Sequence, residues 1–379
     1  MEQTGKGLAL FQLIPAQEFR QLCKKWNIDK RIRTLTARKH VWALVYAYLL
    51  KLDSLREIEA ALGIPKSTLS DANAQRAIGF FEELCRIVLW KIVERSRSRK
   101  VRQSLRTVLA MDSTWCRVHG SLAEGAWEQR HSTGSAGAKL HVIWNVGGEW
   151  IEQFQITPVR CHDAPTTKAF KIHSQCTYVF DRGYNEVSFW WRIMRSRSHF
   201  VSSLRQSKKS KQRTRHLLRG KANRVGVLWD GKWIPTPPTL RKNPQLPKNF
   251  FLRKVIYRDP LTRKIFHFVS SDFQSSAQAI AELYKKRWAV ELLFRWLKGH
   301  LNIRSLQPRN PHAIKIQLTV AVLVQLLVKL YALTKRFMGT LWHCLREIRM
   351  LLTSVGLSEV KKTLFHPYSR SNHCEKLVS

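Results

Sequence analysis

Acidic residues are scarce in this chain of 379 residues. Aspartate and glutamate together number 26 against 66 lysines and arginines, so the formal net charge is +40 and the sequence pI is about 10.6. Such an excess repels itself unless a polyanion neutralises it, and nucleic acid is the polyanion that a pI above about 9 usually indicates. An anionic membrane fits less well, because the basic residues are spread along the whole chain and are not gathered beside one apolar segment.

Paired cysteines are also lacking. The seven cysteines form no Cys-x-x-Cys pair, which argues against a structural zinc site. Their odd number and scattered spacing are typical of reduced thiols in a cytosol. The first residues, Met1 to Lys6, lack the apolar core of a signal peptide, so we expect a cytoplasmic protein. The cysteines are Cys23, Cys85, Cys116, Cys161, Cys176, Cys344 and Cys374.

Long apolar runs are few. The most apolar stretch, 313–333, is interrupted by Lys315, Gln317, Gln325 and Lys329, which favours a buried helix over a membrane span. We therefore expect no membrane partner. The hydrophobic content of 44% is ample for buried cores, and the length indicates two or three domains.

The first 93 residues are predicted to be helical and to contain a helix-turn-helix-like segment. Leu55, Ile58 and Leu62 share one helix face, Gly63 supplies a turn, and Pro65 starts the next helix. The exposed first turn of a recognition helix meets base edges and phosphates. The residues predicted to do so here are Lys66, Ser67 and Thr68. An ordinary helical hairpin fits the same spacing equally well.

Residues 94–106 form a basic segment with six lysines and arginines. It is either a solvated linker or one that follows DNA phosphates. From residue 107 the pattern changes to short strands. The run 107–111 ends at Asp112, the segments 140–146 and 152–156 read as a hairpin through Gly147-Gly148, and 177–180 ends at Asp181. With a helix predicted at 164–172, this predicts a mixed α/β sheet covered by helices.

Residues 205–270 are predicted to be a β-rich insertion. The segment 205–224 holds nine basic residues and no acid, and prolines follow. Two strands, 250–257 and 265–269, then form a hairpin through 259–262.

Residues 275–300 are predicted to form one long helix with two adjoining stripes. The apolar stripe consists of Ala279, Leu283, Val290, Phe294, Leu297 and Leu301. The second stripe contains Tyr284, Arg287, Glu291 and Lys298, which fall within about 60° of one another at 100° per residue. Taken alone, Arg287 and Glu291 are an ordinary ion pair between successive helical turns.

Two other acids change that interpretation. A lone aspartate at a strand end is usually a turn or cap residue. However, Asp112 and Asp181 end strands that can be neighbours, and a helix across the sheet can bring Glu291 to them. Three carboxylates suit two divalent cations about 3.5–4 Å apart. Hard oxygen donors favour Mg²⁺, with Mn²⁺ as a substitute.

The spacing Tyr284, Arg287, Glu291, Lys298 resembles the Y-(2)-R-(3)-E-(6)-K signature of DDE transposases of bacterial insertion sequences, in the fourth insertion-sequence family. Three further blocks are similar to that family: 112–114 (DST), 138–141 (AKLH) and 181–184 (DRGY). The resemblance covers about residues 107–335.

The resemblance implies an α/β fold with an RNase H-like catalytic core and a β-rich insertion between the second and third acids. The chain then divides into a helix-turn-helix-like all-α DNA-binding domain (1–93), a basic linker (94–106), the first part of the core (107–204), the insertion (205–270), the core helix with the signature (271–310) and a helical C-terminal region (311–379).

By the same resemblance, Asp112, Asp181 and Glu291 are catalytic residues and ligands of two Mg²⁺ ions. Tyr284, Arg287 and Lys298 would hold DNA phosphates. The implied activity is metal-dependent cleavage of transposon ends and strand transfer into target DNA, by a homodimer in the synaptic complex, at the nucleoid of a bacterial cytoplasm. Trp229 and Trp233 are candidates to stack a flipped base, and a place in a hairpin core fits them at least as well.

Three alternatives stay open at this point. A domesticated copy would bind double-stranded DNA without cutting it. A transcription regulator that uses only the N-terminal helices would leave the acids unexplained. A different RNase H-like nuclease without strand transfer would leave the signature spacing unexplained.

Overall fold

The structure is a computed structural model, which describes residues 9–98, 107–122, 127–129, 132–205, 214–216, 225–235, 237–304, 306 and 308–365. The chain forms two compact units. The first unit comprises Met1–Val101, Cys116–Gly137 and Trp296–Ser379, and the second comprises Arg102–Trp115 and Ala138–Arg295.

The first unit is mainly helical, as predicted for both ends of the chain. Helix α6 continues to Ser98, so the predicted linker begins within a helix, and residues 99–106 lie outside the described part. The polar tail after Pro367 also lies outside it. The helices are η1 (Ala9–Gln12), α2 (Ala16–Trp26), α3 (Ala37–Leu50), α4 (Leu55–Leu62), α5 (Lys66–Gln75), α6 (Ile78–Ser98), α12 (Pro311–Thr334), α13 (Leu341–Val355) and α14 (Leu357–Phe365), with η2 (Gly120–Leu122) beside them.

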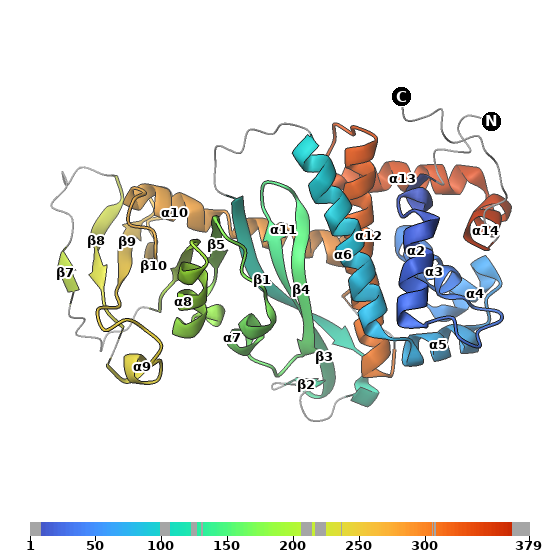
Figure 1. Cartoon of the computed structure of the whole chain (residues 1–379), viewed down its shortest axis with the longest axis horizontal. Helices are drawn as coiled ribbons and strands as arrows, with labels where there is room; N and C mark the ends of the chain where they lie inside the picture. Colours follow the sequence, from blue (N-terminus) through green and yellow to red (C-terminus); the bar gives the residue numbers. More distant parts are fainter. Residues whose placement is uncertain are drawn as a thin grey trace. The chain divides into compact units, whose positions relative to one another are not determined.

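Helix α12 is the core of the first unit. Asn310 caps it through the backbone N–H of His312, and Pro311 begins it. It is buried along most of its length, and it packs along α6 and against α3 (Figure 1). By length and composition alone it could cross a membrane, but 78% of its apolar window is buried inside the protein. The predicted buried helix is thereby confirmed.

Helices α4 and α5 form the predicted pair of short helices. The Ser54 hydroxyl accepts from the N–H of Glu57 and begins α4, which ends at Gly63 in the left-handed conformation with φ +73°. Pro65 precedes α5, and the buried Ile58, Leu62 and Leu69 hold the pair to the unit. Lys66 and Ser67 are exposed in the first turn of α5, and Thr68 is half-buried.

The second unit is built on a mixed sheet, which extends beyond it at β1 and β3. The strands are β1 (Thr107–Val118), β2 (Glu128–Gln129), β3 (Ser132–Asn145), β4 (Trp150–Pro158), β5 (Cys176–Phe180), β6 (His199–Ser203), β7 (Thr214–His216), β8 (Val227–Trp233), β9 (Leu252–Arg258) and β10 (Ile265–Ser270). Their order is β2-β3-β1-β5-β6-β10-β9-β8-β7, with β4 paired to β3. The β1, β5 and β6 strands are parallel, and β10 joins β6 antiparallel.

Several predicted elements differ in extent. Strand β1 runs on to Val118 because it keeps β3 as a neighbour after its pairing with β5 ends, so Asp112 lies inside a strand and not at its end. The helix predicted at 164–172 is only α7 (Asp163–Thr166) followed by η4 (Thr167–Ala169), since Phe170 is extended. The hairpin of β3 and β4 through 146–149 is confirmed.

The strands predicted for the insertion extend the sheet of the core. The β9–β10 hairpin is confirmed, and its turn is held by the Asp259 carboxylate, which accepts from the N–H groups of Leu261 and Thr262. Because β10 pairs with β6, the strands of this region continue one sheet and do not form a separate one.

The single helix predicted for 275–300 is wrong. Helix α10 (Ala277–Lys285) and helix α11 (Trp288–His300) are separated at Lys286 and Arg287, where the N–H groups of Arg287 and Val290 bond three residues back instead of four. This tighter turn shifts the phase of the apolar stripe. Val290, Phe294, Leu297 and Leu301 are buried as predicted, but in α10 the buried positions are Ala277, Ile280 and Ala281 instead of Ala279 and Leu283.

Helices cover both faces of the sheet in the second unit. Phe189, Trp190 and Ile193 of α8 (Val187–Arg195) join one aromatic-rich core with side chains of β1, β5 and β6, such as Met111 and Phe180. Helix α10 packs against β5, β6, β8, β9 and β10 but adds no residue to that core. It therefore covers the opposite face.

The buried His40 of α3 should make the stability of the first unit sensitive to acid. Its Nε2 is 2.8 Å from Asn73 Oδ1, Arg76 lies nearby, and burial lowers its pKa to about 3. An unfolded histidine takes up a proton below about pH 6.5, whereas the folded one does not until about pH 3, so stability falls as the pH drops. Between pH 7 and pH 5, we expect the free energy of unfolding of His40→Gln to fall by about 2 kcal/mol less than that of the wild type. Urea unfolding at both pH values measures this, and equal losses would contradict it.

Candidate active site

Asp112 and Asp181 lie side by side because of the register of two parallel strands. Met111 of β1 pairs with Phe180 of β5, and the two aspartates follow directly. Successive strand residues point to opposite faces. Since Met111 and Phe180 point into the aromatic-rich core, Asp112 and Asp181 point to the other face, which α10 covers. The predicted approach of these two acids is therefore explained by β pairing, although Asp112 is within its strand.

Each aspartate is also bound by its own following backbone. The N–H of Ser113 donates to Asp112 Oδ1 at 2.8 Å, and the N–H of Gly183 donates to Asp181 Oδ1 at 2.7 Å. The Asp181 carboxylate thus begins the short 3-10 helix η5 (Arg182–Tyr184). Backbone donors restrict the rotation of both carboxylates.

Glu291 reaches the same place through Arg287. The Arg287 guanidinium donates from Nη1 to Asp112 Oδ2 and from Nη2 to Glu291 Oε1, each at 2.6 Å. Its Nε is buried without a partner. The break between α10 and α11 places Arg287 in the connecting turn, one helical turn before Glu291. One guanidinium therefore links two carboxylates that are far apart in sequence.

The Asp112 carboxylate is costly to keep ionised. Burial raises the pKa of Asp112 to about 6, and the charges of Asp181 and Glu291 add to the increase, while the N–H of Ser113 and Arg287 act against it. Within the described residues, no three His, Cys, Asp or Glu side chains are grouped so as to hold a metal ion. At this site the Arg287 guanidinium stands between Asp112 and Glu291.

Tyr284 is beside this cluster, and Lys298 belongs to the first unit. The Tyr284 ring packs against Phe268 with ring centroids 4.8 Å apart, and the Arg287 guanidinium carbon lies 5.9 Å from the same ring. Lys298 is half-buried in α11, where its charge acts against the rise in the pKa of Cys116. Arg287 thus contacts two other residues of the predicted polar stripe, Tyr284 and Glu291.

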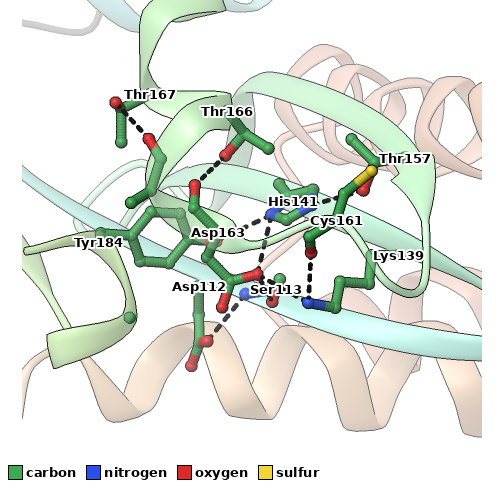
Figure 2. Close-up of polar contacts among 12 residues, drawn as sticks. Asp112, Ser113, Lys139, His141, Thr157, Cys161, Asp163, Thr166, Thr167 and Tyr184 are labelled. Atoms are coloured by element: carbon green, nitrogen blue, oxygen red, sulfur yellow. Dashed lines mark hydrogen bonds and ion pairs between the residues drawn. The ribbon is translucent and has the colours of Figure 1, made fainter. Parts of the chain in front are cut away.

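A fourth carboxylate, Asp163, lies next to these acids and was not predicted. Figure 2 shows the polar contacts around it. Its Oδ1 accepts from Lys139 Nζ at 3.1 Å and from Ser113 Oγ at 3.2 Å. The Lys139 ammonium also donates to the carbonyl of Cys161 at 2.8 Å. The AKLH block therefore contains a lysine whose partner is an acid some two dozen residues later.

His141 and Tyr184 form a second layer around Asp163. His141 Nδ1 is 3.1 Å from the Tyr184 hydroxyl, and its Nε2 is 3.0 Å from Thr157 Oγ1. The Thr157 hydroxyl donates to the carbonyl of Pro158, so it accepts from Nε2–H, and Tyr184 donates to Nδ1. Burial lowers the pKa of His141 to about 4, so the ring is neutral near pH 7. The AKLH and DRGY blocks thus meet in one network.

The two tryptophans predicted for base stacking lie on β8. Trp233 is half-buried against the aromatic-rich core, and its ring is 6.3 Å from that of Trp190. Its contacts are those of a hairpin core residue. Trp229 is half-buried on the same strand.

The raised pKa of Asp112 predicts that its charge destabilises the protein. The unfolded carboxyl ionises near its ordinary value of 3.8, whereas the folded one stays protonated up to about pH 6. The contribution of Asp112 to the free energy of unfolding is therefore lost as the pH rises to 6. Without divalent cations, we expect Asp112→Asn to raise the free energy of unfolding by about 1–2 kcal/mol at pH 8 and to leave it unchanged at pH 4. Urea unfolding tests this, and a variant destabilised equally at both pH values would refute it.

Comparison with known proteins identifies the family. The family described as "Transposase DDE domain" matches residues 103–327, and one described only as a domain of unknown function matches residues 9–72. A protein of Sinorhizobium fredii, named as a transposase, is 28% identical over 291 residues, which are 74% of this chain and 75% of the relative. A protein of Geobacillus stearothermophilus, named as a transposase for an insertion sequence element, is 26% identical over 335 residues, 86% of this chain and 84% of the relative.

A solved structure has a similar fold. The piggyBac transposase in a synaptic complex with hairpin DNA matches with a TM-score of 0.53 and 12% identity, over 96% of this chain and 83% of that one. At this identity the likeness concerns the fold alone. The transposase family match, in contrast, extends over more than half of the sequence. The chain therefore belongs to the transposase DDE domain family and is a DNA transposase of the bacterial insertion-sequence type.

Proposed function

We propose that this transposase works by cut and paste, in which it cleaves the ends of its element and joins them to target DNA, with Asp112, Asp181 and Glu291 as catalytic residues. One observation carries the proposal. Two acids follow the last paired residues of neighbouring parallel strands, and Arg287 bonds one of them to the third acid at 2.6 Å on each side. One guanidinium thus links Asp112 to Glu291, and the strand register sets Asp181 beside Asp112.

We further propose that these acids hold two Mg²⁺ ions, or Mn²⁺ as a substitute. The donor set fits, because carboxylate oxygens are the ligands that these hard cations prefer. The high pKa of Asp112 supports it as well, since a nearby cation would relieve the crowding of negative charge. When bound, such ions activate a water or a 3′-hydroxyl and stabilise the leaving oxygen of a phosphodiester.

Arg287 has the geometry to serve both the acids and DNA. Its planar fork matches carboxylates and phosphates alike. In the structure it pairs with both Asp112 and Glu291. We propose that it turns toward a DNA phosphate beside the cut, with Tyr284 packed next to it and Lys298 contributing positive charge farther along α11.

The rest of the chain would bind and position DNA. We propose that β1 and β3–β6 form an RNase H-like core. We also propose that Lys66, Ser67 and Thr68 of α5 contact double-stranded DNA, at the element's terminal repeats and at the target. Exposure of Lys66 and Ser67 in the first turn of a helix supports this. The spacing of Tyr284, Arg287, Glu291 and Lys298 supports membership of the fourth insertion-sequence family. We also propose a homodimer in the synaptic complex and association with the bacterial nucleoid.

The catalytic assignment can be tested with a plasmid that carries the gene and its flanking genomic DNA. We expect Asp112→Ala, Asp181→Ala and Glu291→Ala each to lower cleavage in Mg²⁺ by at least about 10³-fold while DNA binding is kept. The matched control is Glu282→Ala in α10, which removes an exposed acid paired with Lys285 and should cut normally. Undiminished cutting by any of the three variants would refute its role. Wild-type protein that binds but never cuts would identify a silent copy.

The DNA-binding assignment can be tested by salt dependence. Each neutralised phosphate lowers the slope of log affinity against log salt by about 0.9, so the wild type should have a steep slope. We expect Lys66→Ala to weaken binding and to make the slope shallower by about 1. Titration of a DNA duplex at several salt concentrations measures both values. An unchanged slope would exclude a phosphate contact by Lys66.

A further inference from the structure

We propose that Asp163 is a positioning residue for the active site, which holds the two sheet-borne acids, Asp112 and Asp181, in place through the residues that follow them. The proposal rests on the function proposed above. Asp163 is the first residue of α7, and the residues that contact its carboxylate come from β1, from β3 and from the turn after β5.

On the Asp112 side, the link is Ser113. Its hydroxyl donates to Asp163 Oδ1 at 3.2 Å, while its backbone N–H donates to Asp112 Oδ1 at 2.8 Å. One residue is thus bonded to two acids, through its side chain and through its backbone. Loss of the Asp163 carboxylate would remove this hydrogen bond of the Ser113 hydroxyl and loosen the peptide that orients Asp112.

On the Asp181 side, the link is Gly183. A Cβ added to this glycine would lie 2.9 Å from Asp181 Oδ1 and 3.0 Å from Asp163 Oδ2. The two carboxylates therefore flank the same backbone position, where the Gly183 N–H donates to Asp181 at 2.7 Å. This close approach explains why the DRGY block has a glycine there.

The charge of Asp163 is already compensated, which suits a positioning residue better than a metal ligand. Lys139 pairs with its Oδ1, and the two side chains are 20% and 24% exposed. The Lys139 ammonium is itself fixed by the carbonyl of Cys161 (Figure 2). A paired carboxylate keeps its orientation without adding an uncompensated charge beside Asp112 and Asp181.

A local role in helix capping does not explain these contacts. The N-cap of α7 is His162, which makes no side-chain capping bond. The local hydrogen bond of Asp163 is made by its backbone carbonyl, which accepts from Thr166 Oγ1. Its carboxylate bonds instead to Ser113 and Lys139, 50 and 24 residues away in sequence.

The test is Mn²⁺ binding by the full-length protein, followed by electron paramagnetic resonance of free Mn²⁺ without turnover. Residues that orient metal ligands typically contribute 10–100-fold to metal affinity. We expect Asp163→Asn to weaken Mn²⁺ binding by about 10-fold or more. The Mn²⁺ concentration for half-maximal plasmid cleavage should rise by the same factor, with cleavage partly restored at saturating Mn²⁺ and DNA affinity unchanged.

A second variant and a matched control separate positioning from general instability. Gly183→Ala, which pushes on both carboxylates, should weaken Mn²⁺ binding in the same way. The control is Asp230→Asn in β8, which breaks another buried ion pair of this unit, that of Asp230 with Arg253. It should lower the thermal stability but leave Mn²⁺ binding unchanged.

Two outcomes would overturn the proposal: wild-type Mn²⁺ affinity in Asp163→Asn and Gly183→Ala, or an equal loss of affinity in Asp230→Asn. Failure of the proposed function looks different, because Asp112→Ala would then bind Mn²⁺ like the wild type. In that case the metal would not be held at this site at all.

Discussion

The parallel pairing of β1 with β5 is the constraint on which the proposed active site depends. Met111 and Phe180 are the last paired residues, and both are buried in one aromatic-rich core. That burial determines which face each strand turns to the core. Asp112 and Asp181 therefore leave the pairing side by side on the opposite face. A shift of one residue in either strand would turn its acid into the core, where an unpaired charge is very costly.

The closeness of these acids makes compensation of their charge necessary. Arg287 pairs with both Asp112 and Glu291, and Lys139 pairs with Asp163. Even so, burial keeps the pKa of Asp112 near 6. The site is less stable than a fully paired surface cluster would be, which is a common feature of sites built to take up a cation or a substrate charge.

The break between α10 and α11 has a functional consequence. An unbroken helix would have kept Tyr284, Arg287 and Glu291 on one straight stripe. The tighter turn at Lys286 and Arg287 instead places the guanidinium in a connection, from which it bonds to a strand residue and to a helix residue. In the first unit, a glycine and a proline supply the turn between α4 and α5.

The sequence alone was sufficient for the mixed α/β class of fold, the two short helices on either side of Gly63 and Pro65, and most strands. The catalytic role of Asp112, Asp181 and Glu291 stays a prediction. Periodicity, turn residues and the signature spacing are patterns among residues close to one another in the chain. Such patterns can therefore be recognised from the sequence alone. It also placed Arg287 with Glu291, because helical spacing alone joins them. The domain boundaries and the individual DNA contacts remain predictions.

Only the tertiary structure decided how distant residues meet. Asp163 has no distinctive neighbours in sequence, and its role emerges from contacts with Ser113, Lys139 and Gly183, which come from three other segments. The extent of β1 past Asp112 depends on its neighbour β3, and the continuation of the sheet depends on the pairing of β10 with β6. These features depend on pairing between segments remote in the chain, which no local pattern of residues encodes.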